Sequence, residues 1–126
     1  NKKIAVLGLS FKPNTDDLRE SATFSVIDEL LSEGAKVICH DPQAYKKNVP
    51  ERLKNLPIIL TKTAVEAINN SDAVIIITSW DEYIKLTPRL FRQHMKTPIV
   101  IDGRRIFNKE KFEKEGIIYK GIGLGN

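Results

Sequence analysis

Two positively charged side chains stand in a stretch that joins a strand-like segment to a helix-like one. Lys12 and Arg19 lie between the apolar run Ile4–Leu9 and a helix that we expect to begin near Ser21. A loop in this place sits at the carboxyl edge of a sheet, where open α/β folds hold their ligands. An ammonium, a guanidinium and the N–H groups that open a helix all favour a negatively charged ligand. The stretch therefore predicts a site for an anion such as a diphosphate.

Two further side chains are candidates for the same site. Arg104 follows the apolar run Ile99–Ile101, and its planar guanidinium suits pairs of oxygen atoms. We expect it to reach the same ligand from a neighbouring strand end, and the alternative is an ordinary surface arginine. Phe11 precedes Lys12, so it either packs against the ligand and offers its backbone, or serves as a plain core aromatic.

Strand-like and helix-like segments alternate along the chain, which is typical of βαβ units that feed a parallel sheet. Six strands are expected, at Ile4–Leu9, Lys36–His40, Ile58–Leu60, Ala73–Thr78, Ile99–Ile101 and Ile117–Lys120. Helices are expected from near Ser21 to Gly34, from Thr63 to about Asn70, from Thr87 to about Met95 and from Asn108 to Gly116, with a partly helical connection over 43–56. The predicted fold is α/β, a three-layer Rossmann-like sandwich with a mostly parallel sheet of about six strands.

Composition narrows the function classes. The chain has 126 residues, 41% of them hydrophobic, which fits a single domain over 1–126 with a real core. Its net charge of +4 is spread along the chain, so nucleic-acid binding is not indicated. No apolar run of membrane-spanning length occurs, and Asn1 is followed by charges rather than a signal peptide, so we expect a cytoplasmic protein. The missing initiator Met favours a fragment of a longer chain over a processed one.

Neither cysteine nor histidine chemistry is indicated. Cys39 stands alone inside an apolar strand, where a thiol is usually a buried hydrophobe with a raised pKa rather than a nucleophile. His40 and His94 have no partners at metal-ligand spacing, so we predict neither a metal site nor a general base. Trp80, at a strand-to-helix turn, is expected to pack rather than to bind a ligand.

The glycine pattern of a dinucleotide site is also missing. Bulky residues follow Gly8 where a pyrophosphate would need close backbone approach, so phosphate contact must come from side chains such as Lys12. Asp41, at the end of the second strand, either holds a ribose hydroxyl or caps the next turn. A phosphoacceptor receiver domain is a competing class, but the third expected strand ends in Leu60-Thr61-Lys62 without an acidic acceptor.

Three separated motifs carry a family resemblance. They are Phe11-Lys12-Pro13 with Thr15-Asp16-Asp17-Leu18-Arg19-Glu20-Ser21, then Thr78-Ser79-Trp80-Asp81-Glu82-Tyr83, and Asp102-Gly103-Arg104. In this order they resemble the C-terminal domain of the UDP-glucose/GDP-mannose dehydrogenase family, from Lys3 to about Gly123. The last motif is closer to the members that oxidise UDP-glucose. Ala22 departs from the usual Pro, but both residues suit a first helical turn.

The resemblance implies a two-step, NAD-dependent oxidation of the sugar C6 alcohol to a carboxylate, from UDP-glucose to UDP-glucuronate. It implies that Phe11, Lys12 and Arg104 bind the UDP-sugar and that Arg19 reaches NAD across a domain junction. The catalytic Cys and the glycine-rich NAD loop would belong to preceding domains, so this chain holds no catalytic residue and is inactive alone. A homodimer is expected for the full-length protein.

Two functions of different classes remain open at this point. One is the nucleotide-sugar domain of such a dehydrogenase, which includes members that act on GDP-mannose or UDP-N-acetylhexosamines. The other is a stand-alone regulatory module of the same fold that binds a phosphorylated metabolite without chemistry.

Overall fold

The fold is known from a computed structural model, which describes residues 2–9, 17–42 and 55–122, with only the backbone for 17–22. Six strands form one sheet: β1 (Lys3–Leu7), β2 (Lys36–His40), β3 (Ile58–Leu60), β4 (Ala73–Ile76), β5 (Ile99–Asp102) and β6 (Ile118–Gly121). Their order is β3-β2-β1-β4-β5-β6, and every neighbouring pair is parallel. This confirms the predicted fold class. The strand order reverses between β1 and β4, which is where such sheets bind ligands.

The described helices are α1 (Asp17–Ser32), α3 (Ala64–Ile68), α4 (Asp81–Ile84), α5 (Pro88–His94) and α6 (Lys109–Lys114). The expected N-caps are confirmed at Thr63, Thr87 and Asn108, whose side chains accept backbone N–H groups of the first turn. Thr63 and Glu66 form a complete capping box. Local side-chain chemistry therefore fixes where these three helices begin.

Several predicted boundaries are wrong. The first helix begins at Asp17 rather than near Ser21, and α4 was not anticipated because a single turn of helix gives no periodic signal. β1 ends at Leu7 rather than Leu9, because Gly8 takes a φ of 92°, and β4 ends at Ile76 rather than Thr78. Each of these differences lies near the carboxyl edge of the sheet.

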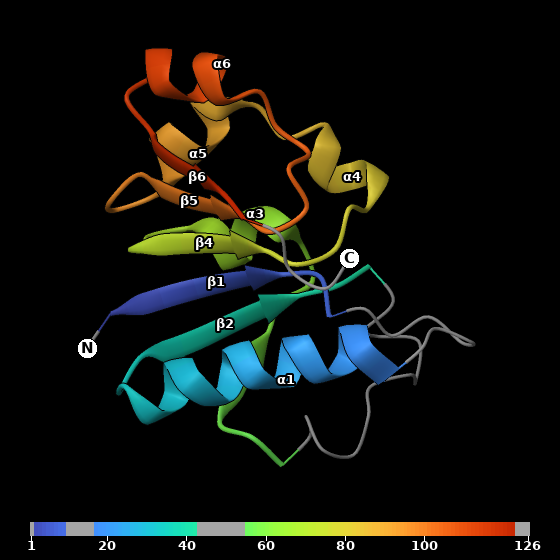
Figure 1. Ribbon diagram of the computed structural model, residues 1–126. Helices are drawn as coiled ribbons and strands as arrows, with labels where there is room; N and C mark the ends of the chain where they lie inside the picture. The colour runs from blue at the N-terminus through green and yellow to red at the C-terminus, as the bar shows by residue number, and fades with distance from the viewer. Residues whose placement is uncertain (1, 10–16, 43–54, 123–126) are drawn as a thin grey trace.

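Two apolar clusters cover opposite faces of the sheet, as the alternation along β1 shows. Ala5 and Leu7 belong to the cluster under α3, α5 and α6, whereas Ile4 and Val6 belong to the cluster under α1. Figure 1 shows α1 running alongside β1 and β2, with α5 and α6 at the β5–β6 end. The predicted three layers are therefore present over the described residues.

Two predictions about single side chains are confirmed in this core. Cys39 is fully buried in β2, and burial raises the pKa of its thiol to about 12. A thiol with that pKa is protonated near neutral pH and is a poor nucleophile. Trp80 packs against the cluster under α3, α5 and α6.

Within the described ranges, no helix combines the length and the apolar character needed to cross a membrane. Nowhere in the same ranges do three or more His, Cys, Asp or Glu residues gather as a metal site would require.

Candidate functional site

The chain leaves β1 through two residues that are both held by β2. The Gly8 N–H donates to the His40 carbonyl at 2.8 Å, and the Leu9 N–H donates to Asp41 Oδ2 at 2.7 Å. Asp41 and Leu9 are both fully buried. A hydrogen bond from a main-chain N–H to a buried carboxylate is among the stronger kinds in proteins. The start of the predicted Phe11–Lys12 loop is therefore anchored to the neighbouring strand.

Gly8 also fits tightly against the end of β4. A Cβ at Gly8 would lie 2.6 Å from both Cβ and Oγ1 of Thr78, a distance that real contacts do not allow. Only glycine therefore fits at this position, which in a dinucleotide-binding fold is the glycine of the tight turn. The further glycines that would bring a pyrophosphate close to the backbone are absent from the sequence that follows Gly8.

His40 of β2 and Tyr83 of α4 form a buried, hydrogen-bonded pair next to Gly8. The Tyr83 hydroxyl donates to the His40 carbonyl at 2.9 Å and lies 2.8 Å from His40 Nδ1. His40 Nε2 is 3.9 Å from the half-exposed carboxylate of Glu82. Burial lowers the pKa of His40 below its usual value, although the charges of Glu82 and Asp41 act in the opposite direction. The His40 carbonyl thus accepts from both Tyr83 and Gly8, and it links α4 to the exit of β1.

The exit of β5 is organised by Asp102, whose carboxylate is fully buried. Its Oδ1 accepts the Arg104 N–H at 3.1 Å, and its Oδ2 accepts the Phe107 N–H at 2.9 Å and the Tyr119 hydroxyl at 2.7 Å. The Gly103 N–H donates to the Ile76 carbonyl of β4 at 2.9 Å. These bonds hold the turn that carries Arg104 against β4 and β6.

The predicted site residues are placed as follows. Arg104 is half-buried directly after β5, at the carboxyl edge of the sheet, as predicted. Arg19 lies in the first turn of α1, where only the backbone is described, and Phe11 and Lys12 lie outside the described residues. The expectation that Arg104 follows a strand next to β1 is wrong, because β4 separates β1 from β5. The sequence could not reveal this, since strand order depends on crossovers and not on local pattern.

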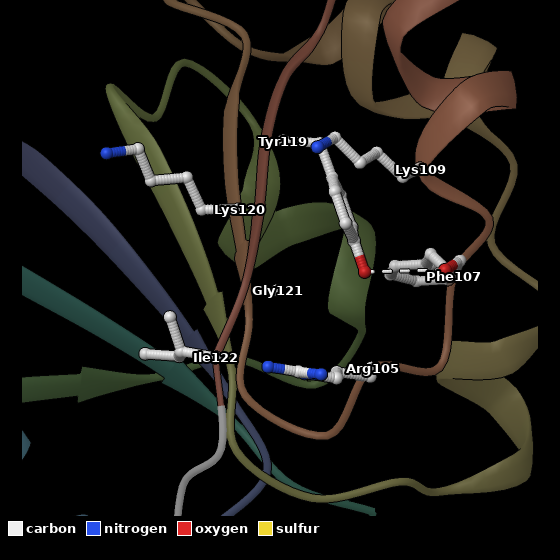
Figure 2. A pocket seen from close by; sticks show the side chains of 7 residues that line it. All are labelled: Arg105, Phe107, Lys109, Tyr119, Lys120, Gly121 and Ile122. Carbon is white, nitrogen blue, oxygen red and sulfur yellow. Dashed lines mark hydrogen bonds between the residues drawn. The ribbon is translucent and has the colours of Figure 1, made fainter.

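A hollow of about 630 Å³ opens beside β6, where no site residue was predicted. It is lined by Arg105, Phe107, Lys109, Tyr119, Lys120, Gly121 and Ile122. Figure 2 shows the Tyr119 hydroxyl pointing to the Phe107 carbonyl, while Lys120 and Ile122 project to the other side of the strand. Because its three cations do not converge on one point, the hollow itself indicates no ligand.

Sequence reasoning missed the residues that support Arg104. Asp102 was recognised only as part of a motif, and Tyr119 was not considered. The available signal was an aspartate at a strand end before a glycine, followed later by a tyrosine in the last strand. Only the register, which pairs Asp102 with Gly121 and Val100 with Tyr119, brings the carboxylate and the hydroxyl together.

Comparison with known proteins decides the family. Residues 5–109 match the family model described as "UDP-glucose/GDP-mannose dehydrogenase family, UDP binding domain". The chain belongs to this family. The resemblance indicated by the three motifs is therefore confirmed, and the matched range contains the exits of both β1 and β5.

Relatives within the family are similar over nearly the whole chain. The UDP-glucose 6-dehydrogenase of Rhizobium meliloti is 40% identical over 121 residues, which is 96% of this chain and 27% of the relative. The enzyme of the same name from Haloferax volcanii is also 40% identical over 121 residues, 96% of this chain and 26% of the relative. The chain thus spans about a quarter of the length of these curated relatives.

Solved structures of related dehydrogenases share the fold. An NDP-N-acetyl-D-galactosaminuronic acid dehydrogenase from Methanosarcina mazei matches with a TM-score of 0.73 at 28% identity, over 98% of this chain and 25% of the other. A UDP-glucose dehydrogenase from Pyrobaculum islandicum matches with a TM-score of 0.66 at 31% identity, over the same shares of the two chains. The fold described above, with the exits of β1 and β5 at one edge of its sheet, is therefore shared with solved members of this family.

Proposed function

We propose that this chain is the UDP-sugar-binding domain of an NAD-dependent dehydrogenase that oxidises UDP-glucose to UDP-glucuronate in two steps. The observation that carries the proposal is the match of residues 5–109 to a UDP-binding domain. Relatives named UDP-glucose 6-dehydrogenase, 40% identical to this chain, support the choice of sugar. The chain is then one domain of a longer, homodimeric enzyme.

Within that enzyme this chain supplies binding rather than chemistry. Lys12 and Arg104 contact the diphosphate of the UDP-sugar as cations, and Phe11 lies beside Lys12. The catalytic cysteine belongs to another part of the polypeptide, in keeping with the burial and the raised pKa of Cys39. The isolated chain is therefore expected to bind UDP without turnover.

The oxidant of such an enzyme is NAD, which accepts hydride from the sugar carbon. The sequence after Gly8 lacks the further glycines that a dinucleotide needs for close approach of its pyrophosphate to the backbone. This supports a cofactor held mainly by a preceding domain. Arg19, near the start of α1, is the residue of this chain proposed to reach it.

A different sugar is the second candidate. The solved NDP-N-acetyl-D-galactosaminuronic acid dehydrogenase has a higher TM-score, 0.73, than the solved UDP-glucose dehydrogenase, 0.66. A stand-alone regulatory module has no such observation in its favour, because the relatives are about four times as long as this chain.

Calorimetric titration of the chain with UDP, UDP-glucose and GDP-mannose tests the proposal. Each of the changes Lys12→Ala and Arg104→Ala should weaken UDP binding by about 1.5–3 kcal/mol, the usual contribution of a hydrogen bond to a charged group. Lys36→Ala is the matched control, because Lys36 is an exposed lysine at the opposite end of β2. UDP affinity that is unchanged in both variants would refute the assignment of Lys12 and Arg104 to the diphosphate. Stronger binding of GDP-mannose than of UDP-glucose would refute UDP-glucose as the substrate.

A further inference from the structure

We propose that Asp102 and Tyr119 are positioning residues that hold the main chain of Arg104 in place for the diphosphate. This inference rests on the proposed function, because it assumes that Arg104 binds the diphosphate of UDP. Asp102 and Tyr119 do not themselves contact UDP in this proposal. Neither residue needs to move or to change its charge. They fix the position of the Arg104 main chain, from which its side chain extends.

The carboxylate of Asp102 spans the whole turn after β5. Its two oxygens accept the N–H groups of Arg104 and Phe107, two and five residues further along the chain, at 3.1 and 2.9 Å. Asp102 is fully buried, and a buried carboxylate is stable only when its oxygens are well bonded. The turn and the carboxylate therefore depend on each other.

The backbone inside this turn is strained. Arg105, directly after Arg104, has a φ of 53°, which residues with a side chain seldom adopt. Such a conformation persists only where surrounding contacts hold it. The bonds that Asp102 makes on either side of Arg105 are the contacts that do so.

Tyr119 connects the turn to β6. Its hydroxyl donates to Asp102 Oδ2 at 2.7 Å. The same hydroxyl lies 3.3 Å from the Phe107 carbonyl, as Figure 2 shows. The ring is mostly buried and packs against Phe112 with a centroid distance of 5.5 Å, so the hydroxyl has a fixed place relative to the sheet. Asp102 is thus held from a strand that carries no predicted ligand contact.

The register of the sheet places Tyr119 within reach of Asp102. β6 pairs with β5 so that Gly121 is opposite Asp102 and Tyr119 is opposite Val100, two residues before the aspartate. The register and the tyrosine together favour one conformation of the Arg104 turn.

A double-mutant cycle tests whether Tyr119 acts through Arg104. Tyr119→Phe removes the hydroxyl but keeps the ring, and we expect it to weaken UDP binding by roughly three- to tenfold in calorimetric titration, the effect of one hydrogen bond. In the Arg104→Ala background the same change should have almost no further effect on UDP affinity. Asp102→Asn should weaken binding more than Tyr119→Phe, because it introduces an N–H donor facing other donors.

Thr63→Ala is the control for a general loss of stability, since it removes the N-cap of α3, which follows β3, the edge strand opposite β6. It should lower the melting temperature and leave UDP affinity unchanged. Equal effects of Tyr119→Phe with and without Arg104, or none in either background, would overturn the inference and leave the proposed function standing. Failure of the unaltered chain to bind UDP would overturn both.

Discussion

After β1 and after β5 the chain leaves the sheet, and in each place main-chain N–H groups need an acceptor that the strands do not supply. Each exit uses a buried aspartate at the carboxyl end of a strand to accept main-chain N–H groups. At β1 the aspartate is Asp41, which directly follows β2 and is 32 positions away from Leu9. At β5 the aspartate is Asp102, which lies on the strand itself and bonds residues just ahead of it.

The difference determines how each turn depends on the rest of the molecule. The β1 exit needs β2 for its hydrogen bonds and the end of β4 for the steric fit at Gly8. The β5 exit is built mostly from its own residues, with one hydrogen bond from the Gly103 N–H to β4 and one from the Tyr119 hydroxyl of β6. Substitutions that disturb the packing of neighbouring strands should therefore affect the β1 exit more than the β5 exit.

Of the changes at the two exits, Gly8→Ala should cause the largest loss in the free energy of unfolding. The new Cβ would meet Thr78 at 2.6 Å, and Gly8 has a φ of 92°, so we expect a loss of about 2–4 kcal/mol in the free energy of unfolding. Denaturant titration followed by circular dichroism measures it. Gly34→Ala is the matched control, because Gly34 has a φ of 85° but no atom within 4 Å of the added Cβ. Equal losses in the two variants would show that the contact with Thr78 does not matter.

Asp41→Ala should have the next largest effect. It leaves the buried Leu9 N–H without its carboxylate, at a cost of about 1–3 kcal/mol in unfolding free energy. Asp72→Ala is the comparable change at the other end of β1, where Asp72 Oδ2 accepts the Lys3 N–H at 2.9 Å. Because that bond is only partly buried, water can replace the lost acceptor and the loss there should be smaller. A larger loss at Asp72 would contradict the picture of a dry, tightly held β1 exit.

Acid should loosen the β1 exit with the smallest effect of the three. Burial lowers the pKa of His40 below 6.5, so below that pH the unfolded chain takes up a proton that the folded chain resists. The stability that this contributes is complete above pH 6.5 and is lost as the pH falls towards the folded-state pKa. His40→Gln should flatten the decline in unfolding free energy between pH 7 and 5, as measured by denaturant titration.

Amide exchange separates the two exits in the same experiment. At mildly acidic pH, exchange at Gly8 and Leu9 should accelerate more than exchange at Arg104 and Phe107, after correction for intrinsic rates. The reason is that His40 bonds the β1 exit through its carbonyl and makes no described bond to the β5 turn. Equal acceleration at both places would mean that His40 acts on the whole fold.

Much of the fold could be predicted because its signals are local. Continuous apolar runs marked the six strands, and the caps at Thr63, Thr87 and Asn108 marked three helices. The boundaries at Gly8 and Thr78 could not be predicted from the same signals. Both lie where those two residues, which follow different strands, are in close contact.

The candidate site rests on the same kind of local signal. The residue types of Lys12, Arg19 and Arg104 near strand ends predict an anion site, which stays a prediction, and the family match to a UDP-binding domain supports that chemistry. The role of Asp41 shows the limit. The sequence left it between a ribose contact and a turn cap, and the structure places its carboxylate on Leu9, 32 positions away.

The sequence by itself determined the alternation of strands and helices, the buried thiol of Cys39 and the motifs that identify the family. Apolar runs, capping residues and motif letters carry that information within a few positions of one another. Only the tertiary structure decided that β4 separates β1 from β5, that Thr78 fills the space beside Gly8, and that Tyr119 bonds Asp102. Strand order and register set these contacts, and both arise from packing between segments distant in the chain.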